Sequence, residues 1–346
     1  MQPLLVNGVP FCPAGAPKCG IEADLAAFLT EWYSDKETME LQTSGSTGTP
    51  KKIRVRKKYM RNSALSTCRF FGLQKGDSAL LCLPLRFIAG KMMVVRAIVG
   101  GLNLVTAEPS STPLAQLKQT VDFAPLVPMQ ALNTLQQSNG REQLAKARTI
   151  LLGGGFVDPA LEAALQPCNT AVFASYGMTE TLSHIALRRV NGAQRSPYYT
   201  PLEGVRVSLT PKDTLAVTAP HLGIELLETN DLADILPNGQ FRILGRVDSV
   251  INSGGIKIQA ESIEQELVAA TGVQVLAVPM PHPILGQAVG LLWEGHISRE
   301  AALQQAIATL PKYHRPHRTL HVILPRTATG KLNRAEGAAM LAAAAL

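Results

Sequence analysis

The sequence predicts an α/β protein with two domains, in which a large α/β domain with a mainly parallel sheet precedes a small α+β domain. Three observations lead to this expectation. Short apolar runs alternate with helical patterns from residue 78 to 176, residues 200–244 change to short β segments, and a compact mixture of helices and strands follows Gly245. The length of 346 residues also exceeds the size, about 250–300 residues, at which a single core stops growing.

The first part of the chain alternates strands with helices. The expected strands are Ala79–Leu83, Leu102–Thr106, Leu126–Val127, Thr149–Leu152 and Ala171–Tyr176, and the helical segments between them include Leu114–Thr120, Ala131–Gln137 and Pro159–Leu165. Such alternation favours helices on both faces of a mainly parallel sheet. Turn signals at 211–213 and 237–239 then divide residues 200–244 into the short β segments of a small barrel or meander.

A domain boundary is expected near Gly245, which divides the chain into residues 1–244 and 245–346. The second part contains the helical patterns Glu261–Ala270 and Arg299–Leu310 and the strand patterns Gln274–Val278, Ala288–Trp293 and Thr319–Leu324. Ser298 has the residue type that favours the N-cap of the second helix. The alanine-rich end from Gly337 to Leu346 predicts a short terminal helix.

The composition is that of an ordinary globular protein, with 46% hydrophobic and 17% charged residues. The best candidate for a membrane span, Met92 to Val105, is interrupted by Arg96 and by Gly100-Gly101, and the N-terminus lacks the pattern of a signal peptide. The five cysteines are scattered and have no metal-binding spacing. We therefore expect a cytoplasmic protein with reduced thiols and no membrane partner.

The net charge is +7, and seven basic residues lie between Lys51 and Arg61. Aromatic residues do not interleave with these charges and no nucleic-acid motif is present, so we expect no nucleic-acid partner. Two interpretations of the basic segment remain. It is either a solvated face or a surface that attracts polyanionic small molecules such as ATP and coenzyme A.

The segment T-S-G-S-T-G-T-P-K, from Thr43 to Lys51, combines five hydroxyl side chains with two glycines and a lysine. Glycines let backbone N–H groups approach an anion, hydroxyls donate hydrogen bonds and lysine adds a full charge. It differs from a Walker A loop because Pro50 stands where that pattern requires glycine. The segment therefore predicts a polyphosphate site, formed by Thr43, Ser44, Gly45, Ser46, Thr47, Gly48 and Lys51.

This segment resembles the phosphate loop of the adenylate-forming enzymes, and four further segments match that family in order. The first is Gly153, Gly154 and Gly155, directly after a predicted strand; in the family this turn packs against adenine. The resemblance implies the adenylate-forming fold, with ATP bound at the carboxyl ends of the parallel strands.

The second matching segment is Y-G-M-T-E, residues 176–180, which resembles the family's Y-G-x-T-E motif. The resemblance implies that Tyr176 stacks on adenine, that Thr179 bonds a phosphate and that Glu180 holds Mg²⁺. A carboxylate completed by phosphate oxygens is a ligand set that suits Mg²⁺.

The third segment implies nucleotide contacts and a hinge. Asp231 lies in T-N-D, where the family reads T-G-D and the aspartate accepts hydrogen bonds from the ribose hydroxyls. Arg246 and Asp248 lie in G-R-V-D, which resembles the hinge motif: the arginine binds ribose or phosphate and the aspartate is the pivot between the domains. Gly254 and Gly255 follow in a loop that the resemblance places against coenzyme A.

The last segment, P-R-T-A-T-G-K, ends in Lys331 and resembles the loop whose lysine completes the adenylation site. A mobile point charge suits this role, because negative charge builds between a carboxylate and an α-phosphate as they react. The resemblance therefore implies Lys331, Thr179 and Glu180 as catalytic residues, with ATP, Mg²⁺ and coenzyme A as cofactor and co-substrates.

The implied reaction has two steps. A carboxylate attacks the α-phosphate of Mg-ATP and gives an acyl-adenylate and pyrophosphate. The small domain then turns about Asp248, which removes Lys331, and the thiol of coenzyme A attacks the adenylate to give a thioester. Catalysis by positioning and charge stabilisation requires no protein nucleophile.

Segments at 83–85, 89–90, 127–130 and 253–255 resemble those of the o-succinylbenzoate–CoA ligases of menaquinone synthesis. The residues expected to line the acid pocket are Arg86, Lys91, Gln130, Ser175 and Gly177. Arg86 and Lys91 are the basic residues suited to a second substrate carboxylate. His184 either lines this pocket or packs in the core.

Two alternatives remain open at this point: another aryl- or acyl-CoA ligase or an adenylation enzyme that loads a carrier protein, and a non-catalytic nucleotide-binding module. The chain also has only 42 residues before Thr43, where the family usually has a much longer segment. We therefore expect sheet edges that need cover, for example from a second copy in a homo-oligomer.

Overall fold

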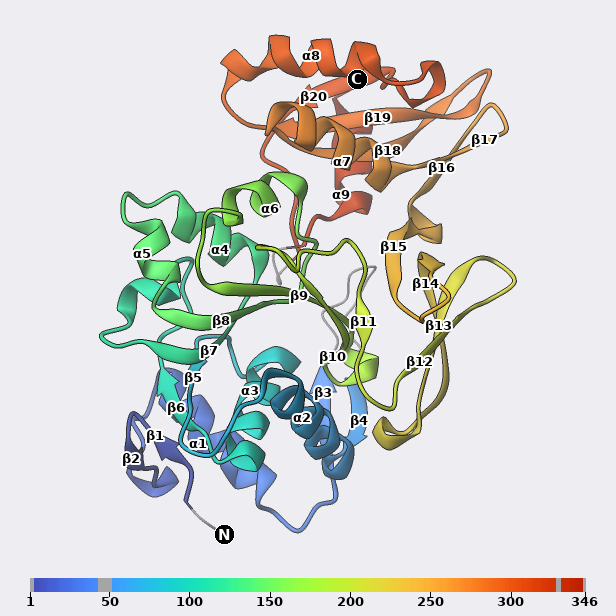
Figure 1. Ribbon diagram of the computed structural model, residues 1–346. Helices are drawn as coiled ribbons and strands as arrows, with labels where there is room; N and C mark the ends of the chain where they lie inside the picture. The colour runs from blue at the N-terminus through green and yellow to red at the C-terminus, as the bar shows by residue number, and fades with distance from the viewer. Residues whose placement is uncertain (1–2, 43–51, 328–330, 345–346) are drawn as a thin grey trace.

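A computed structural model of the chain describes residues 3–42, 52–327 and 331–344 (Figure 1). Its largest sheet has nine strands in the order β11-β10-β9-β8-β7-β5-β6-β1-β2. These are β1 (Leu5–Val6), β2 (Val9–Pro10), β5 (Ser78–Leu81), β6 (Asn103–Thr106), β7 (Val121–Leu126), β8 (Ala147–Leu152), β9 (Ala171–Gly177), β10 (His184–Arg189) and β11 (Thr200–Pro201). The six strands from β9 to β1 along this order pair in parallel, which confirms the predicted sheet type.

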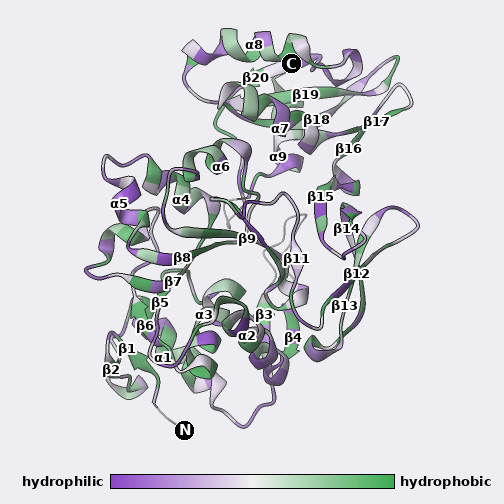
Figure 2. Ribbon diagram, viewed as in Figure 1, coloured by the Kyte–Doolittle hydropathy of each residue, from purple (hydrophilic) through white to green (hydrophobic). Residues whose placement is uncertain are grey.

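Helices cover both faces of this sheet, so its central strands are buried on both sides. The neighbouring residues Leu80 and Leu81 of β5 belong to two different hydrophobic cores. The core of Leu81 includes residues of α1 (Ile21–Trp32), α2 (Lys57–Phe71) and α3 (Ile88–Gly100). The core of Leu80 includes residues of α4 (Pro128–Leu135), α5 (Gly140–Leu144) and α6 (Pro159–Leu165). Parallel strands buried on two faces are expected to be apolar throughout. Figure 2 shows the central strands as largely hydrophobic.

Both edges of the large sheet end in short strands that contain proline. At one edge β2 has two residues and ends in Pro10, and at the other β11 has two residues and ends in Pro201. Proline lacks the N–H that an added strand would need, and very short edges offer few pairing groups. The chain therefore protects these edges by its own sequence, and a homo-oligomer stays a prediction.

Two smaller sheets stand beside the large one. The antiparallel sheet predicted in residues 200–244 consists of β12 (Arg206–Leu209), β13 (Thr214–Ala219), β14 (Ile224–Ile235) and β15 (Phe241–Arg246). The strands β3 (Thr38–Gln42) and β4 (Lys52–Arg56) form an antiparallel pair on either side of the phosphate-loop segment, residues 43–51, which lies outside the described residues.

The C-terminal part has its own five-stranded sheet and its own cores (Figure 1). Its elements are β16 (Val250–Ser253), β17 (Ile256–Gln259), α7 (Ala260–Thr271), β18 (Gln274–His282), β19 (Gly286–Glu294), α8 (Glu300–Thr309), β20 (Arg318–His321) and α9 (Arg334–Ala343). The division at residue 245 stays a prediction, although the hydrophobic clusters separate close to it: Phe241 belongs to a cluster of the large sheet and Ile251 to a C-terminal one.

Short 3-10 turns complete the described structure: Pro13–Gly15, Pro113–Gln116, Thr179–Thr181, Pro220–Leu222, Val247–Ser249, Ile297–Arg299 and Lys312–His314. Two expectations were wrong here. The helix predicted over 114–120 is only a 3-10 turn, because the chain becomes extended at Leu117. Ser298 does not cap α8; it lies in the preceding turn, where its N–H donates to the ring of His296. Among the described residues, no helix is long and apolar enough to cross a membrane.

Candidate active site

A tyrosine, an aspartate and an arginine from three strands meet at the end of the large sheet. The hydroxyl of Tyr176, near the end of β9, donates a hydrogen bond of 2.6 Å to Asp231 of β14. Arg246, at the end of β15, pairs in register with Asp231 and donates to its other oxygen at 3.1 Å. Burial and the neighbouring Asp231 raise the pKa of Tyr176, so the phenol remains a hydrogen-bond donor.

The ring of Tyr176 is held by aromatic neighbours. Phe241 packs edge-on against it with ring centroids 5.3 Å apart, and Tyr199 lies at 6.0 Å. A ring fixed in this way suits stacking on a flat heterocycle, since little side-chain freedom is left to lose on binding. The structure therefore places the residue predicted to contact adenine beside the one predicted to bind ribose.

Arg246 also connects this cluster to the predicted hinge. Its Nε and Nη2 each donate a hydrogen bond of 2.8 Å to the carboxylate of Asp248. These bonds lower the pKa of Asp248, which stays ionised. One guanidinium thus holds two carboxylates, Asp231 and Asp248, at the point where the chain passes into the C-terminal part.

Lys331 reaches the same cluster from the C-terminal part of the chain. It is half-buried, and its charge interacts with Arg246, Asp231 and Glu180. Burial lowers the pKa of Lys331, Arg246 adds to this effect, and the two carboxylates oppose it. The backbone of Lys331 is fixed by hydrogen bonds with Thr327: the Thr327 N–H donates to the Lys331 carbonyl at 2.7 Å, and the Lys331 N–H donates to the Thr327 hydroxyl at 3.2 Å. The structure therefore brings together predicted site residues that lie as far as 155 positions apart, from Tyr176 to Lys331.

The turn after β9 carries the two other residues predicted to be catalytic. Thr179 is buried and Glu180 is exposed, in a 3-10 turn whose end forces Leu182 to a φ of +66°. No hydrogen bond or ion pair to a described residue holds the Glu180 carboxylate, and no three metal-ligating side chains of the described chain gather into a metal site. A single free carboxylate fits Mg²⁺ that arrives on phosphate oxygens, which is how that ion is usually bound beside a nucleotide.

The three glycines after β8 lie beside Ser175 of β9 and beside Val127 and Pro128 at the start of α4. A Cβ on Gly153 would lie 3.0 Å from the hydroxyl of Ser175, and Gly154 has a φ of +75°. The Ser175 hydroxyl itself donates to the carbonyl of Leu152 at 2.9 Å, so it joins the ends of β8 and β9. Gly177 is essential for a different reason: a Cβ there would lie 2.3 Å from the carbonyl oxygen of Ser183.

The remaining predicted pocket residues do not converge on this cluster. Arg86 is exposed, and its guanidinium lies over the ring of Phe87. The ammonium of Lys91 donates to the Glu40 carbonyl at 3.4 Å. Both ends of the Gln130 amide are used within the fold: its oxygen accepts from the Val127 N–H, and its nitrogen donates to the Ser110 carbonyl.

The predicted coenzyme A loop is also apart from the site. Gly254 and Gly255 form the turn between β16 and β17, with φ values of +60° and +86°. In Figure 1 this hairpin extends away from β9 and β14. The described arrangement therefore joins Lys331, and not this loop, to the residues predicted to bind the nucleotide.

The sequence analysis missed one further residue, Arg96 of α3. Its side chain is only 2% exposed, and its Nη2 donates a hydrogen bond of 2.6 Å to the hydroxyl of Ser183, beside Gly177. No carboxylate of the described residues pairs with it, and the residues outside the described ranges contain no Asp or Glu. The available signal was an arginine inside the apolar run Met92–Val105, which the sequence analysis used only to exclude a membrane span.

Comparison with known proteins agrees with this arrangement. A family model described as AMP-binding enzyme matches residues 41–222, and the chain belongs to this family. A 2-succinylbenzoate–CoA ligase of Bacillus mycoides (strain KBAB4) is 27% identical over 372 residues, covering 97% of this chain and 76% of that protein. The enzyme of the same name from Lactococcus lactis is 24% identical, covering 88% and 72%.

Solved structures show the same fold. An acyl-CoA synthetase (AMP-forming)/AMP-acid ligase II-like protein from Dyadobacter fermentans is 32% identical, with a TM-score of 0.64 over 94% of this chain and 96% of that one. The o-succinylbenzoate CoA synthetase of Bacillus subtilis, solved with its acyl-adenylate intermediate, is 23% identical, with a TM-score of 0.73 over 86% and 68%. The predicted adenylate-forming fold is confirmed.

Proposed function

We propose that this protein is an o-succinylbenzoate–CoA ligase. It activates a carboxylate with ATP, releasing pyrophosphate, and then transfers the acyl group from AMP to the thiol of coenzyme A. The observation that carries this proposal is that Lys331 lies close enough to Asp231, Arg246 and Glu180 for their charges to interact, which adds a cation to groups suited to ribose, phosphate and Mg²⁺. The names of the relatives support the same reaction.

In the first step, Lys331 supplies positive charge between the attacking carboxylate and the α-phosphate, where negative charge accumulates. Asp231 accepts hydrogen bonds from the ribose hydroxyls, and Tyr176 covers the adenine. Thr179 is positioned to donate to a phosphate oxygen, and Glu180 would hold Mg²⁺. The metal, when bound, neutralises phosphate charge; the protein residues orient the two reactants.

The substrate proposal rests on Arg96. Burial lowers the pKa of Arg96 to about 10, so the guanidinium is still charged at neutral pH. A buried charge without a counter-ion is costly in a folded protein. An acid with a second carboxylate supplies the missing counter-ion, and o-succinylbenzoate has one on its ring. Arg96 is therefore a better partner for that carboxylate than Arg86 or Lys91, which are exposed or bonded to the backbone.

The test is release of AMP that depends on coenzyme A, measured with o-succinylbenzoate, its analogue without the ring carboxylate, benzoate and a medium-chain fatty acid. We expect o-succinylbenzoate to exceed the analogue by at least about tenfold in kcat/KM, which corresponds to ~1.4 kcal/mol. Preference for benzoate or the fatty acid would discard this substrate but not the ligase reaction. Transfer to a carrier protein in place of coenzyme A would support an adenylation enzyme instead, and failure of ATP–pyrophosphate exchange with every acid would support a non-catalytic module.

We also propose that the enzyme acts in the cytoplasm. All five cysteines are free, and buried Cys82 is held as a thiol because burial raises its pKa to about 12. Reduced cysteines are typical of that compartment. Labelling of the accessible Cys12 and Cys19 in intact cells would test this proposal.

A further inference from the structure

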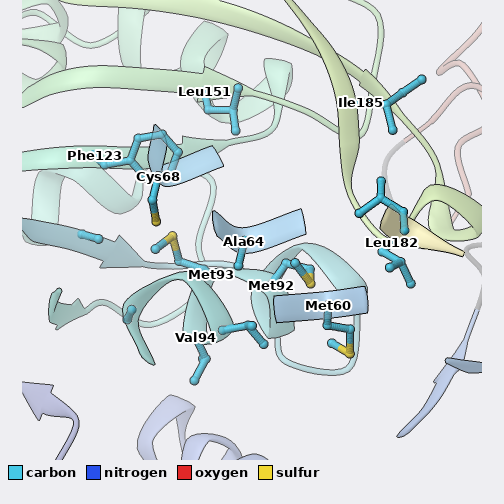
Figure 3. Packing of buried hydrophobic residues seen from close by; sticks show 14 of the residues in the cluster. Met60, Ala64, Cys68, Met92, Met93, Val94, Phe123, Leu151, Leu182 and Ile185 are labelled. Atoms are coloured by element: carbon cyan, nitrogen blue, oxygen red, sulfur yellow. The ribbon is translucent and has the colours of Figure 1, made fainter. Parts of the chain in front are cut away.

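A line of polar side chains crosses the apolar core between α2, α3 and β10. Arg96 Nη2 donates to Ser183 Oγ at 2.6 Å, Ser183 Oγ lies 3.3 Å from His184 Nδ1, and His184 Nε2 lies 3.1 Å from Thr67 Oγ1. Thr67 Oγ1 in turn donates to the Ser63 carbonyl at 3.1 Å. The surroundings are apolar: Met60, Met92, Met93, Leu182 and Ile185 belong to one buried hydrophobic cluster, and Figure 3 shows Met60 of α2 beside Met92 of α3.

Hydrogen-bond donors set the direction of this line. A guanidinium can only donate, so the Ser183 oxygen accepts from Arg96 and its own proton is left for His184 Nδ1. His184 then carries its proton on Nε2 and donates to Thr67, whose hydroxyl proton goes to the helix carbonyl. In the opposite tautomer the proton of His184 is on Nδ1, so the Ser183 hydroxyl proton has no acceptor in this line. The single proton of the Thr67 hydroxyl would then have to serve both His184 Nε2 and the Ser63 carbonyl.

The line orients Arg96 without neutralising it. His184 is only 6% exposed, and burial together with the charge of Arg96 lowers its pKa well below the usual range, so the ring is neutral. Every other member is also neutral at physiological pH. A carboxylate in the place of Ser183 or His184 would hold the guanidinium equally well, but it would also satisfy the charge that a substrate anion must meet.

The position of the line connects it with the acid pocket. His184 pairs with Gly177 across β9 and β10, and the Ser183 carbonyl oxygen lies 2.3 Å from where a Cβ of Gly177 would be, so the serine is in direct contact with a residue expected in that pocket. The Nε of Arg96 is buried and has no hydrogen-bond partner among the described residues, so the donor capacity of this guanidinium is not fully used within the described fold.

We propose that Ser183 and His184 are positioning residues that fix Arg96 for the second carboxylate of the acyl substrate. This inference rests on the proposed function. The neutral hydrogen-bonded line of Ser183, His184 and Thr67 sets the direction of the Arg96 guanidinium and leaves its charge for the substrate anion.

The test compares Ser183→Ala with the wild type on o-succinylbenzoate and on the analogue without the ring carboxylate. Hydrogen bonds to charged groups are among the stronger ones in proteins. We therefore expect a loss of at least about tenfold in kcat/KM for o-succinylbenzoate, mainly through KM, and less than about a twofold change for the analogue. Ser183→Thr keeps the hydroxyl and should restore the preference. Ser66→Ala is the control, because the Ser66 hydroxyl donates to the Asn62 carbonyl within α2, and it should leave kcat/KM for both acids unchanged.

Equal losses of Ser183→Ala on both acids would overturn the inference, because a purely structural defect does not distinguish them. An unchanged o-succinylbenzoate KM would overturn it as well. If Ser183→Ala does not fold, His184→Gln provides the same comparison from the next member of the line. The proposed function is tested separately, in the wild type. A wild-type enzyme that does not use o-succinylbenzoate refutes the proposed function. A wild-type enzyme that prefers o-succinylbenzoate, together with a Ser183→Ala variant that keeps this preference, refutes only the positioning role of Ser183 and His184.

Discussion

Gln259 of β17 donates a hydrogen bond of 3.0 Å to the backbone carbonyl of Arg246, across the predicted pivot at Asp248. The approach is so close that a Cβ on Gly245 would lie 2.2 Å from the Gln259 Nε2 atom. The same amide also contacts Glu261, which pairs with Arg334, three residues after Lys331. Any rotation of the C-terminal part about Asp248 must break the bond to Arg246, so this contact favours the arrangement in which Lys331 reaches the residues proposed to bind the nucleotide.

Gln259→Leu should therefore slow adenylate formation and spare the second half-reaction. A hydrogen bond of this kind contributes about 0.5–1.5 kcal/mol, so we expect a loss of roughly two- to tenfold in the first step. Pyrophosphate release and thioester formation from preformed acyl-adenylate are measured separately. Thr309→Ala, at the end of α8, serves as the control, because its hydroxyl donates to the Ala306 carbonyl of the same helix. Equal slowing of both steps would contradict this role.

Lys331→Ala should reduce adenylate formation by at least about a hundredfold, since it removes a charge aimed at the transition state. Thioester formation from preformed acyl-adenylate should remain largely intact, because the proposed rotation has by then removed the lysine. Single-turnover assays of the two steps give the answer. A folded variant that loses both steps alike would exclude the two-arrangement mechanism.

The pH dependence of adenylate formation should show the lowered pKa of Lys331. Only the protonated amine has the required charge, and burial places its pKa below the ordinary value of about 10.4. The kcat/KM for ATP should therefore fall as the pH rises through this lowered pKa, while kcat should fall at a higher pH because bound phosphates favour the charged amine. If the rate of the thioester step fell in the same alkaline range, the pH dependence would have to be assigned to a group other than Lys331.

Glu180→Gln should raise the Mg²⁺ concentration needed for half-maximal activity. The amide fills the same space but compensates less of the charge of a divalent cation. Because Glu180 is exposed, folding should not change appreciably, and thermal unfolding verifies this. A magnesium titration identical to that of the wild type would show that this carboxylate is not the ligand.

Arg96→Met should separate stability from selectivity. The substitution removes a buried charge that no carboxylate neutralises, so the unfolding temperature should stay the same or rise, while the preference for o-succinylbenzoate over its analogue should be lost.

Arg334→Met is the matched comparison. Arg334 pairs with the largely buried Glu264, and leaving that carboxylate alone should cost about 3 kcal/mol in the free energy of unfolding. Urea unfolding of both variants measures the difference. Strong destabilisation by Arg96→Met would mean that its charge is compensated in the protein without any ligand.

The sequence by itself determined the class of protein and most of its elements. Local patterns suffice for this: the Pro159–Leu165 helix and the strand ending at Leu152 both follow from short segments whose residue types reflect local backbone preferences. Where a local signal was weak, as at the 3-10 turn after Pro113, the tertiary environment decided instead.

Only the tertiary structure decided which charges are left without partners. The sequence shows Arg86, Lys91 and Arg96 only as three basic residues close together in the chain. In the structure Arg86 is exposed, Lys91 donates to a backbone carbonyl, and Arg96 is buried without a carboxylate partner. Burial and pairing depend on residues distant in sequence, here on Ser183 and His184, which lie nearly 90 positions from Arg96. The energy of a charge is set by its surroundings and not by its own type, and those surroundings exist only after the chain has folded.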